Sequence, residues 1–161
     1  MHRVGQFVAH VRARVDPEEA ALVRRILPEG GVTLFEAMPV ADRRHGLDVA
    51  ERLLRAGHDD RDVLAAALLH DAAKGHRMRL WHRVAGVLLE KVAPAALRRL
   101  ARSDPTSWRH PFHLYLHHPQ LSAGLSADAG CPPRVAAFIR GKVADPDLPL
   151  LQALTAADDA G

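Results

Sequence analysis

An apolar run that ends in a histidine and an aspartate is the feature that most constrains the fold of this chain. Residues 63–69 are all apolar, and His70-Asp71 follows them directly. The period of this segment fits a helix that Asp60 caps and Gly75 ends, with one face inside the protein. Burying an imidazole and a carboxylate costs free energy unless a partner compensates them. A divalent metal ion is such a partner, because it takes neutral imidazole and carboxylate groups as ligands.

The chain as a whole predicts an all-α fold. Aromatic residues make up only 4% of it, and no segment alternates apolar and polar residues for long, so strands are not expected. Proline, glycine and aspartate residues separate segments with helical spacing of apolar residues. The expected helices cover residues 4–15, 17–27, 39–56, 61–73, 80–92, 94–102, 111–129, 132–140 and 149–159. We assign the break after residue 27 to Pro28 and Gly30-Gly31.

The length of 161 residues fits one domain with its own core. We expect a single helical bundle over residues 39–161, with residues 1–38 as a small N-terminal helical extension that caps it. No run of 18 apolar residues occurs, so neither a membrane span nor a membrane partner is expected. The N-terminus has no signal-peptide core, and the single cysteine, Cys131, fits a reducing compartment. A cytoplasmic location is therefore expected.

The charge of the chain is mildly basic, with a net value of +3. Arginine dominates the basic residues, but it is scattered among acidic residues and accompanies no helix-turn-helix or zinc-finger pattern. A nucleic-acid partner is therefore not expected, whereas a small anionic substrate suits such a surface. The apolar content of the N-terminal helices is compatible with a homodimer.

Three further segments accompany His70-Asp71, in a fixed order along the chain. Arg-His-Gly-Leu-Asp-Val-Ala spans residues 44–50, His-Pro-Gln-Leu-Ser-Ala spans 118–123, and Thr-Ala-Ala-Asp-Asp spans 155–159. Together with Leu-Leu-His-Asp-Ala-Ala-Lys at 68–74, they resemble the motifs of the HD-domain metal-dependent phosphohydrolases, a superfamily of α-helical enzymes. The resemblance covers about three quarters of the chain, from residue 39 to residue 159.

The resemblance implies a metal site and a hydrolytic activity. Its four implied ligands are His45, His70, Asp71 and Asp158. This mix of imidazole and carboxylate suits Mn²⁺, Fe²⁺, Co²⁺, Ni²⁺ or Zn²⁺, and Mg²⁺ is a further candidate. Such an ion lowers the pKa of a water molecule and polarises a phosphoryl oxygen. The expected function is hydrolysis of a small phosphorylated substrate, such as a nucleotide.

One segment departs from the pattern of the two-metal members of this superfamily. Those members usually have a histidine pair before the closing aspartate, where residues 138–143 here read Phe-Ile-Arg-Gly-Lys-Val. We therefore expect one ion per chain. The residues expected to bind substrate are Lys74, His118, Arg140 and Lys142, and those expected to be catalytic are Lys74, His118 and Asp71. The same departure leaves an alternative open: a non-catalytic HD-like module that binds a nucleotide and regulates a partner.

Overall fold

The computed structural model describes residues 16–160, apart from the side chain of Leu80. This part of the chain contains nine α-helices, one 3₁₀ turn and no strand, so the expected all-α class is confirmed. The α-helices are α2 (Pro17–Ile26), α3 (Glu29–Ala37), α4 (Val40–Arg55), α5 (Arg61–Leu69), α6 (Leu80–Val92), α7 (Pro94–Leu100), α8 (His110–Asp128), α9 (Pro133–Arg140) and α10 (Leu148–Asp159). The helix expected over residues 4–15 lies outside the described residues.

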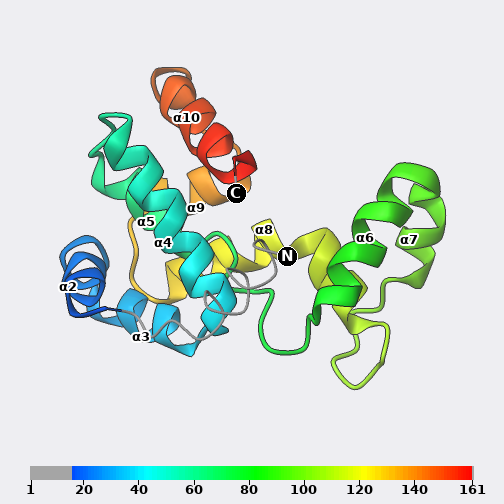
Figure 1. Ribbon diagram of the computed structural model, residues 1–161. Coiled ribbons are helices and arrows are strands. Elements are labelled where there is room, and N and C mark those ends of the chain that lie inside the picture. The colour runs from blue at the N-terminus through cyan, green and yellow to red at the C-terminus, as the bar shows by residue number, and fades with distance from the viewer. Residues whose placement is uncertain (1–15, 161) are drawn as a thin grey trace, which may run out of the picture.

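Helix α5 is the centre of the bundle. All residues from Val63 to Leu69 are buried, and α5 packs against α2, α3, α4, α9 and α10 (Figure 1). Its N-terminus is capped by Asp60, whose side chain accepts hydrogen bonds from the backbone of Asp62 and Val63. Burial of seven consecutive apolar residues supplies much of the hydrophobic stabilisation of this small domain. The apolar run therefore lies inside the protein, as expected.

The N-terminal helices α2 and α3 share this core. Val23, Ile26 and Phe35 are each less than 5% exposed and belong to the same buried cluster as α5. The segment that we expected to cap the bundle thus contributes to its hydrophobic core.

Helices α6 and α7, with the turns that flank them, form an arm beside the bundle (residues 77–109). They contact each other and the first half of α8, which connects them to the bundle (Figure 1). Within the described part of the chain, no residue between Ala72 and Ala123 belongs to the main buried core. No helix in residues 16–160 is both long and apolar enough to cross a lipid bilayer.

The expected break at Gly30-Gly31 is wrong, because both glycines lie inside α3. Their role is close packing rather than chain reversal. A Cβ atom on Gly30 would lie 2.5 Å from the backbone oxygen of Ala129, and one on Gly31 would lie 3.3 Å from Sγ of Cys131. Only hydrogen in place of a side chain allows α3 to approach the end of α8 this closely.

The helix expected to run to Ala73 ends four residues earlier, at Leu69. The backbone N–H of Ala73 donates to Oγ of Ser122 on α8, 3.0 Å away, so it makes no bond back to Leu69. Leu69 instead accepts from Ala72 in a tighter turn, and Gly75 follows with a φ of 58°. His70 and Asp71 therefore stand at the end of a buried helix, where the chain turns.

Candidate metal centre

Three side chains from three helical segments converge at one point. His45 lies on α4, His70 immediately follows α5, and Asp158 lies near the end of α10. Nε2 of His45 is 2.8 Å from Oδ1 of Asp158, and Nε2 of His70 is 3.5 Å from the same oxygen. Their ligand atoms all lie within 4.8 Å of one another, which is close enough for one ion to bind all three.

Gly46 explains how α4 brings His45 to the end of α5. A Cβ atom at Gly46 would lie 3.0 Å from the backbone oxygen of Leu68 and 3.1 Å from that of Ala67. The missing side chain lets the two helices pack with their backbones almost in contact. His45 is therefore held beside His70, with ring centroids 5.2 Å apart.

The orientation of His70 is fixed from its other ring nitrogen. Nδ1 donates to the backbone oxygen of Ala67 at 2.9 Å, which leaves Nε2 as the atom with a free lone pair. Nε2 is buried and has no hydrogen-bond partner. Burial lowers the pKa of His70, but the neighbouring carboxylates of Asp158 and Asp71 outweigh it and raise the pKa above its ordinary value. A metal ion at this point would therefore compete with a proton for Nε2 of His70.

Asp71 is 1% exposed, and its two oxygens have different surroundings. Oδ2 accepts from Nζ of Lys74 at 2.6 Å. Oδ1 is buried without a hydrogen-bond partner, 3.5 Å from Nε2 of His70 and 3.8 Å from Nε2 of His118. Burial raises the pKa of Asp71, but His70 and Lys74 more than offset this and lower it. The expected fourth ligand thus stands beside the group of three, next to His70.

Asp158, rather than the neighbouring Asp159, is the carboxylate that reaches the site. Its hydrogen bond with His45 and the nearby imidazole of His70 hold its pKa well below the ordinary range, so it is ionised. Asp159 is exposed. Arg52 helps to place α10, because its guanidinium donates to the backbone oxygen of Ala157 at 3.1 Å.

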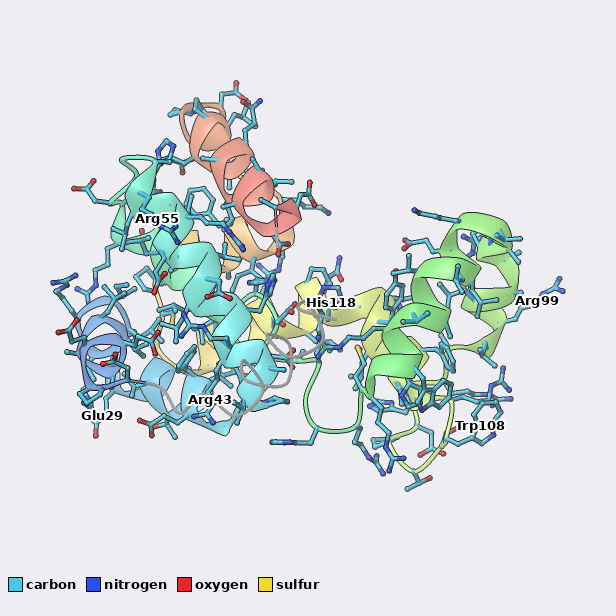
Figure 2. All side chains as sticks on the ribbon, in the orientation of Figure 1. Glu29, Arg43, Arg55, Arg99, Trp108 and His118 are labelled. Atoms are coloured by element: carbon cyan, nitrogen blue, oxygen red, sulfur yellow. The ribbon has the colours of Figure 1, made fainter. Side chains whose placement is uncertain are left out.

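His118 approaches the site from α8, which lies between the bundle and the arm (Figure 2). Pro119 has no N–H, so the backbone oxygen of Tyr115 lacks its usual helical donor. Nδ1 of His118 donates to that oxygen at 2.8 Å and so turns Nε2 toward Asp71. Burial and the charge of Lys74 lower the pKa of His118, which is therefore neutral at pH 7.

A half-open pocket of about 230 Å³ adjoins these residues. His70, His118 and Asp158 form its polar wall, and Arg140 adds a cation at the end of α9. The other lining residues are Pro119, Phe138, Ile139, Gly141, Leu151, Leu154 and Thr155. Lys142 is exposed and is not among the lining residues, so its expected contact with substrate stays a prediction without structural support.

Two supporting residues escaped the sequence analysis, and spacing could have identified both. Arg52 lies seven residues after His45, and Ser122 lies four residues after His118, so each shares a helix face with a site residue. Each fixes a backbone segment that carries a candidate ligand. The histidines of α8 behave differently: His110, His113 and His117 stack along the helix, but among residues 16–160 only His45, His70 and Asp158 form a metal-sized group.

Comparisons of this chain with protein-family models, with curated proteins and with solved structures find no match.

Proposed function

We propose that this protein is a metal-dependent phosphohydrolase of the HD-domain type, which acts on a nucleotide or a similar small phosphate ester. The observation that carries the proposal is the pair of buried atoms Nε2 of His70 and Oδ1 of Asp71, which face each other without a hydrogen bond. Proteins rarely leave buried polar atoms unpaired, and one divalent ion would satisfy both. His45 and Asp158 supply further ligand atoms from α4 and α10.

The residues around the site suit an anionic ester. A divalent ion held by this set would supply Lewis acidity toward a phosphoryl oxygen and lower the pKa of a water molecule. Lys74 fixes Asp71 through its short hydrogen bond and adds positive charge nearby. Nε2 of the neutral His118 imidazole has a lone pair, so it is placed to accept a hydrogen bond from substrate or to take a proton from a water molecule. Arg140 attracts the phosphate to the pocket that these residues line.

A second candidate function is a non-catalytic module that binds a nucleotide. The observation that favours it is the end of α9, which lines the pocket with Phe138, Ile139 and Arg140 and offers no histidine for a second ion. An apolar wall suits the base of a nucleotide and one cation suits its phosphate, so such a pocket can bind a nucleotide without catalysing a reaction.

The test is hydrolysis by the purified chain, loaded in turn with Mn²⁺, Fe²⁺, Co²⁺, Ni²⁺, Zn²⁺ and Mg²⁺. The substrates are p-nitrophenyl phosphate, bis-p-nitrophenyl phosphate and a panel of nucleotides. We expect release of phosphate or of nitrophenol with at least one metal. Asp158→Asn should lower the rate at least about 100-fold, because the residue is a ligand, whereas Asp159→Asn should retain it.

Calorimetric titration with the same nucleotides separates the two candidates. Turnover that depends on Asp158 supports the phosphohydrolase. Nucleotide binding without turnover under every metal would contradict it and support the binding module. Turnover that survives Asp158→Asn would show that another site, or a contaminant, is responsible.

A further inference from the structure

The exposed face of α6 is apolar. Trp81, Val84 and Leu88 recur at helical spacing, and each is more than half exposed. Val92 extends the same face, and it is 83% exposed at the end of the helix. The opposite face is the one that packs on α8, where Gly86 lies so close to Tyr115 that a Cβ atom would be 2.7 Å from its ring. Residues 16–160 therefore leave most of this face exposed, although the ring of Trp81 also lies against Phe112 of α8, with ring centroids 6.1 Å apart.

Apolar exposure is concentrated on the arm, which we define as residues 77–109. Ten large hydrophobic residues are exposed in the described part of the chain, and six of them belong to the arm. These six are Trp81, Val84, Val87, Leu88, Val92 and Trp108. Scattered single residues need no explanation, but a contiguous patch of this kind marks an interaction surface.

The arm also carries the positive charge of the protein. It contains eight arginine or lysine residues and two acidic residues, a net charge of +6 in a chain whose total is +3, so the remainder of the chain is negative. The exposed cations are Arg77, Arg79, Lys91, Arg98, Arg99 and Arg102. Figure 2 places Arg99 and Trp108 on the side of the arm away from the bundle.

We propose that the arm docks on the surface of an anionic phospholipid bilayer, with α6 lying in the interface. An interfacial helix combines an apolar face containing tryptophan or leucine with nearby arginine and lysine residues, and it binds through buried apolar area and attraction to anionic lipid. The arm has each of these features. We expected no membrane partner because no segment of the chain can span a bilayer. That criterion does not test for a helix that lies along the surface of a bilayer.

Charge complementarity and apolar exposure together favour an anionic bilayer on this face over a second copy of the chain and over nucleic acid. A second copy of the chain would bring one arm of charge +6 against another, and like charges repel across a self-complementary contact. Nucleic acid would match the charge, but the aliphatic stripe of Val84, Leu88 and Val92 offers nothing to phosphates or to base edges. An anionic bilayer satisfies both the cations and the apolar stripe.

The test is flotation of the full chain with two kinds of vesicle: phosphatidylcholine alone, and phosphatidylcholine with an equal amount of phosphatidylglycerol. Both tryptophans of the chain lie on the arm, so a blue shift of intrinsic fluorescence reports insertion directly. We expect binding and a blue shift with the anionic vesicles only, weakened by salt. Arg98→Gln combined with Arg99→Gln should weaken binding about 25-fold, at about 1 kcal/mol per charge.

Leu88→Glu should abolish the blue shift, while Leu125→Glu, at an exposed leucine of α8, should preserve it. Circular dichroism of each variant establishes that it folds. Failure of the wild type to bind either vesicle would overturn the proposal, and equal binding to both would overturn the requirement for anionic lipid. A wild-type dimer that Leu88→Glu dissociates would assign the face to a second copy. A blue shift with single-stranded DNA but not with vesicles would assign it to nucleic acid.

Discussion

Asp71 is the carboxylate of the candidate metal centre that most needs a compensating charge. It is almost completely buried, yet only one of its two oxygens has a hydrogen bond, and that bond comes from Lys74. A buried carboxylate in this position is stable only while cations or a metal ion compensate it. Either the ammonium group of Lys74 or a bound metal ion can therefore compensate the negative charge of Asp71.

This relation predicts the effect of Lys74→Met. In the presence of a chelator the variant should lose about 3 kcal/mol of unfolding free energy, because Asp71 is left buried with less compensation. Saturating Mn²⁺ should reduce that loss, since the ion takes over the role of the ammonium group. Urea unfolding of the variant, of wild type and of Lys91→Met, at an exposed lysine, measures the difference. An equal loss with and without metal would remove Asp71 from the ligand set.

At the level of single residues, the sequence predicts which side chains converge better than it predicts the distances between them. His45, His70 and Asp158 were expected to converge and do so. Spacing along a chain gives the face of a helix on which a residue lies, but the final distances depend on how closely helices pack. Here Gly46 sets the approach of α4, and Arg52 fixes α10. Spacing places Arg52 on the helix face of His45, but no local pattern in the sequence gives its partner on α10 or the close approach at Gly46.

At the scale of elements, Gly30 shows how a local rule can fail. Paired glycines usually interrupt a helix, because glycine costs roughly 1 kcal/mol relative to alanine. In α3 that cost is offset by the contact with the end of α8, which only a residue without a side chain permits. The packing partner is about 100 residues away in sequence, so periodicity could not reveal it.

Two glycine substitutions test this explanation. Gly30→Ala should destabilise the protein by about 1–3 kcal/mol, because its Cβ would overlap the backbone of Ala129. Gly124→Ala, inside α8, should instead stabilise it by about 0.5–1 kcal/mol, because a Cβ there meets no atom within 4 Å. Thermal unfolding of both variants would show opposite shifts in Tm. Stabilisation by Gly30→Ala would contradict the packing of α3 on α8.

The N-cap of α5 gives a prediction about pH. Burial raises the pKa of Asp60, but the hydrogen bonds from Arg134 and from the backbone of Val63 outweigh it, so the net shift is downward. A carboxylate whose pKa is lower in the folded state stabilises fully above its unfolded pKa of about 4, and this contribution is lost as pH falls through the folded value.

Asp60→Ala should therefore cost about 1–2 kcal/mol at pH 7, where the cap is fully charged. Below about pH 4 the gap between the variant and wild type should narrow, since wild type loses the same contribution by protonation. Asp59→Ala, at the adjacent exposed aspartate, should change stability by less than about 0.5 kcal/mol. A gap that stays constant from pH 7 to pH 2.5 would mean that the charge of Asp60 does not stabilise the helix.

At the scale of the whole molecule, the bundle and the arm should differ in stability. The main core takes its residues from the bundle, whereas α6 is exposed along one face. One ion pair between the two parts, from Arg83 on α6 to the buried Asp42 on α4, links the arm to the bundle. Local opening requires less free energy where few apolar contacts are broken.

Native-state hydrogen exchange should therefore show two levels of protection. The amides of α5 and α9 should exchange only through global unfolding, and those of α6 and α7 through local opening at lower free energy. Anionic vesicles should raise the protection of the arm alone. Equal protection of the arm and the bundle in free protein would show that they unfold as one unit. Sequence periodicity identified both arm helices, but it could not show that their apolar residues would lie outside the core.

We propose that α4, the end of α5 and α10 meet at one divalent metal ion. Elemental analysis of the chain, purified without chelator and compared with Asp158→Asn and Asp159→Asn, tests it most directly. We predict about one transition-metal ion per chain in wild type and in Asp159→Asn, and a large loss in Asp158→Asn. Wild-type protein that holds no ion after reloading, or an Asp158→Asn variant with undiminished metal content, would contradict it.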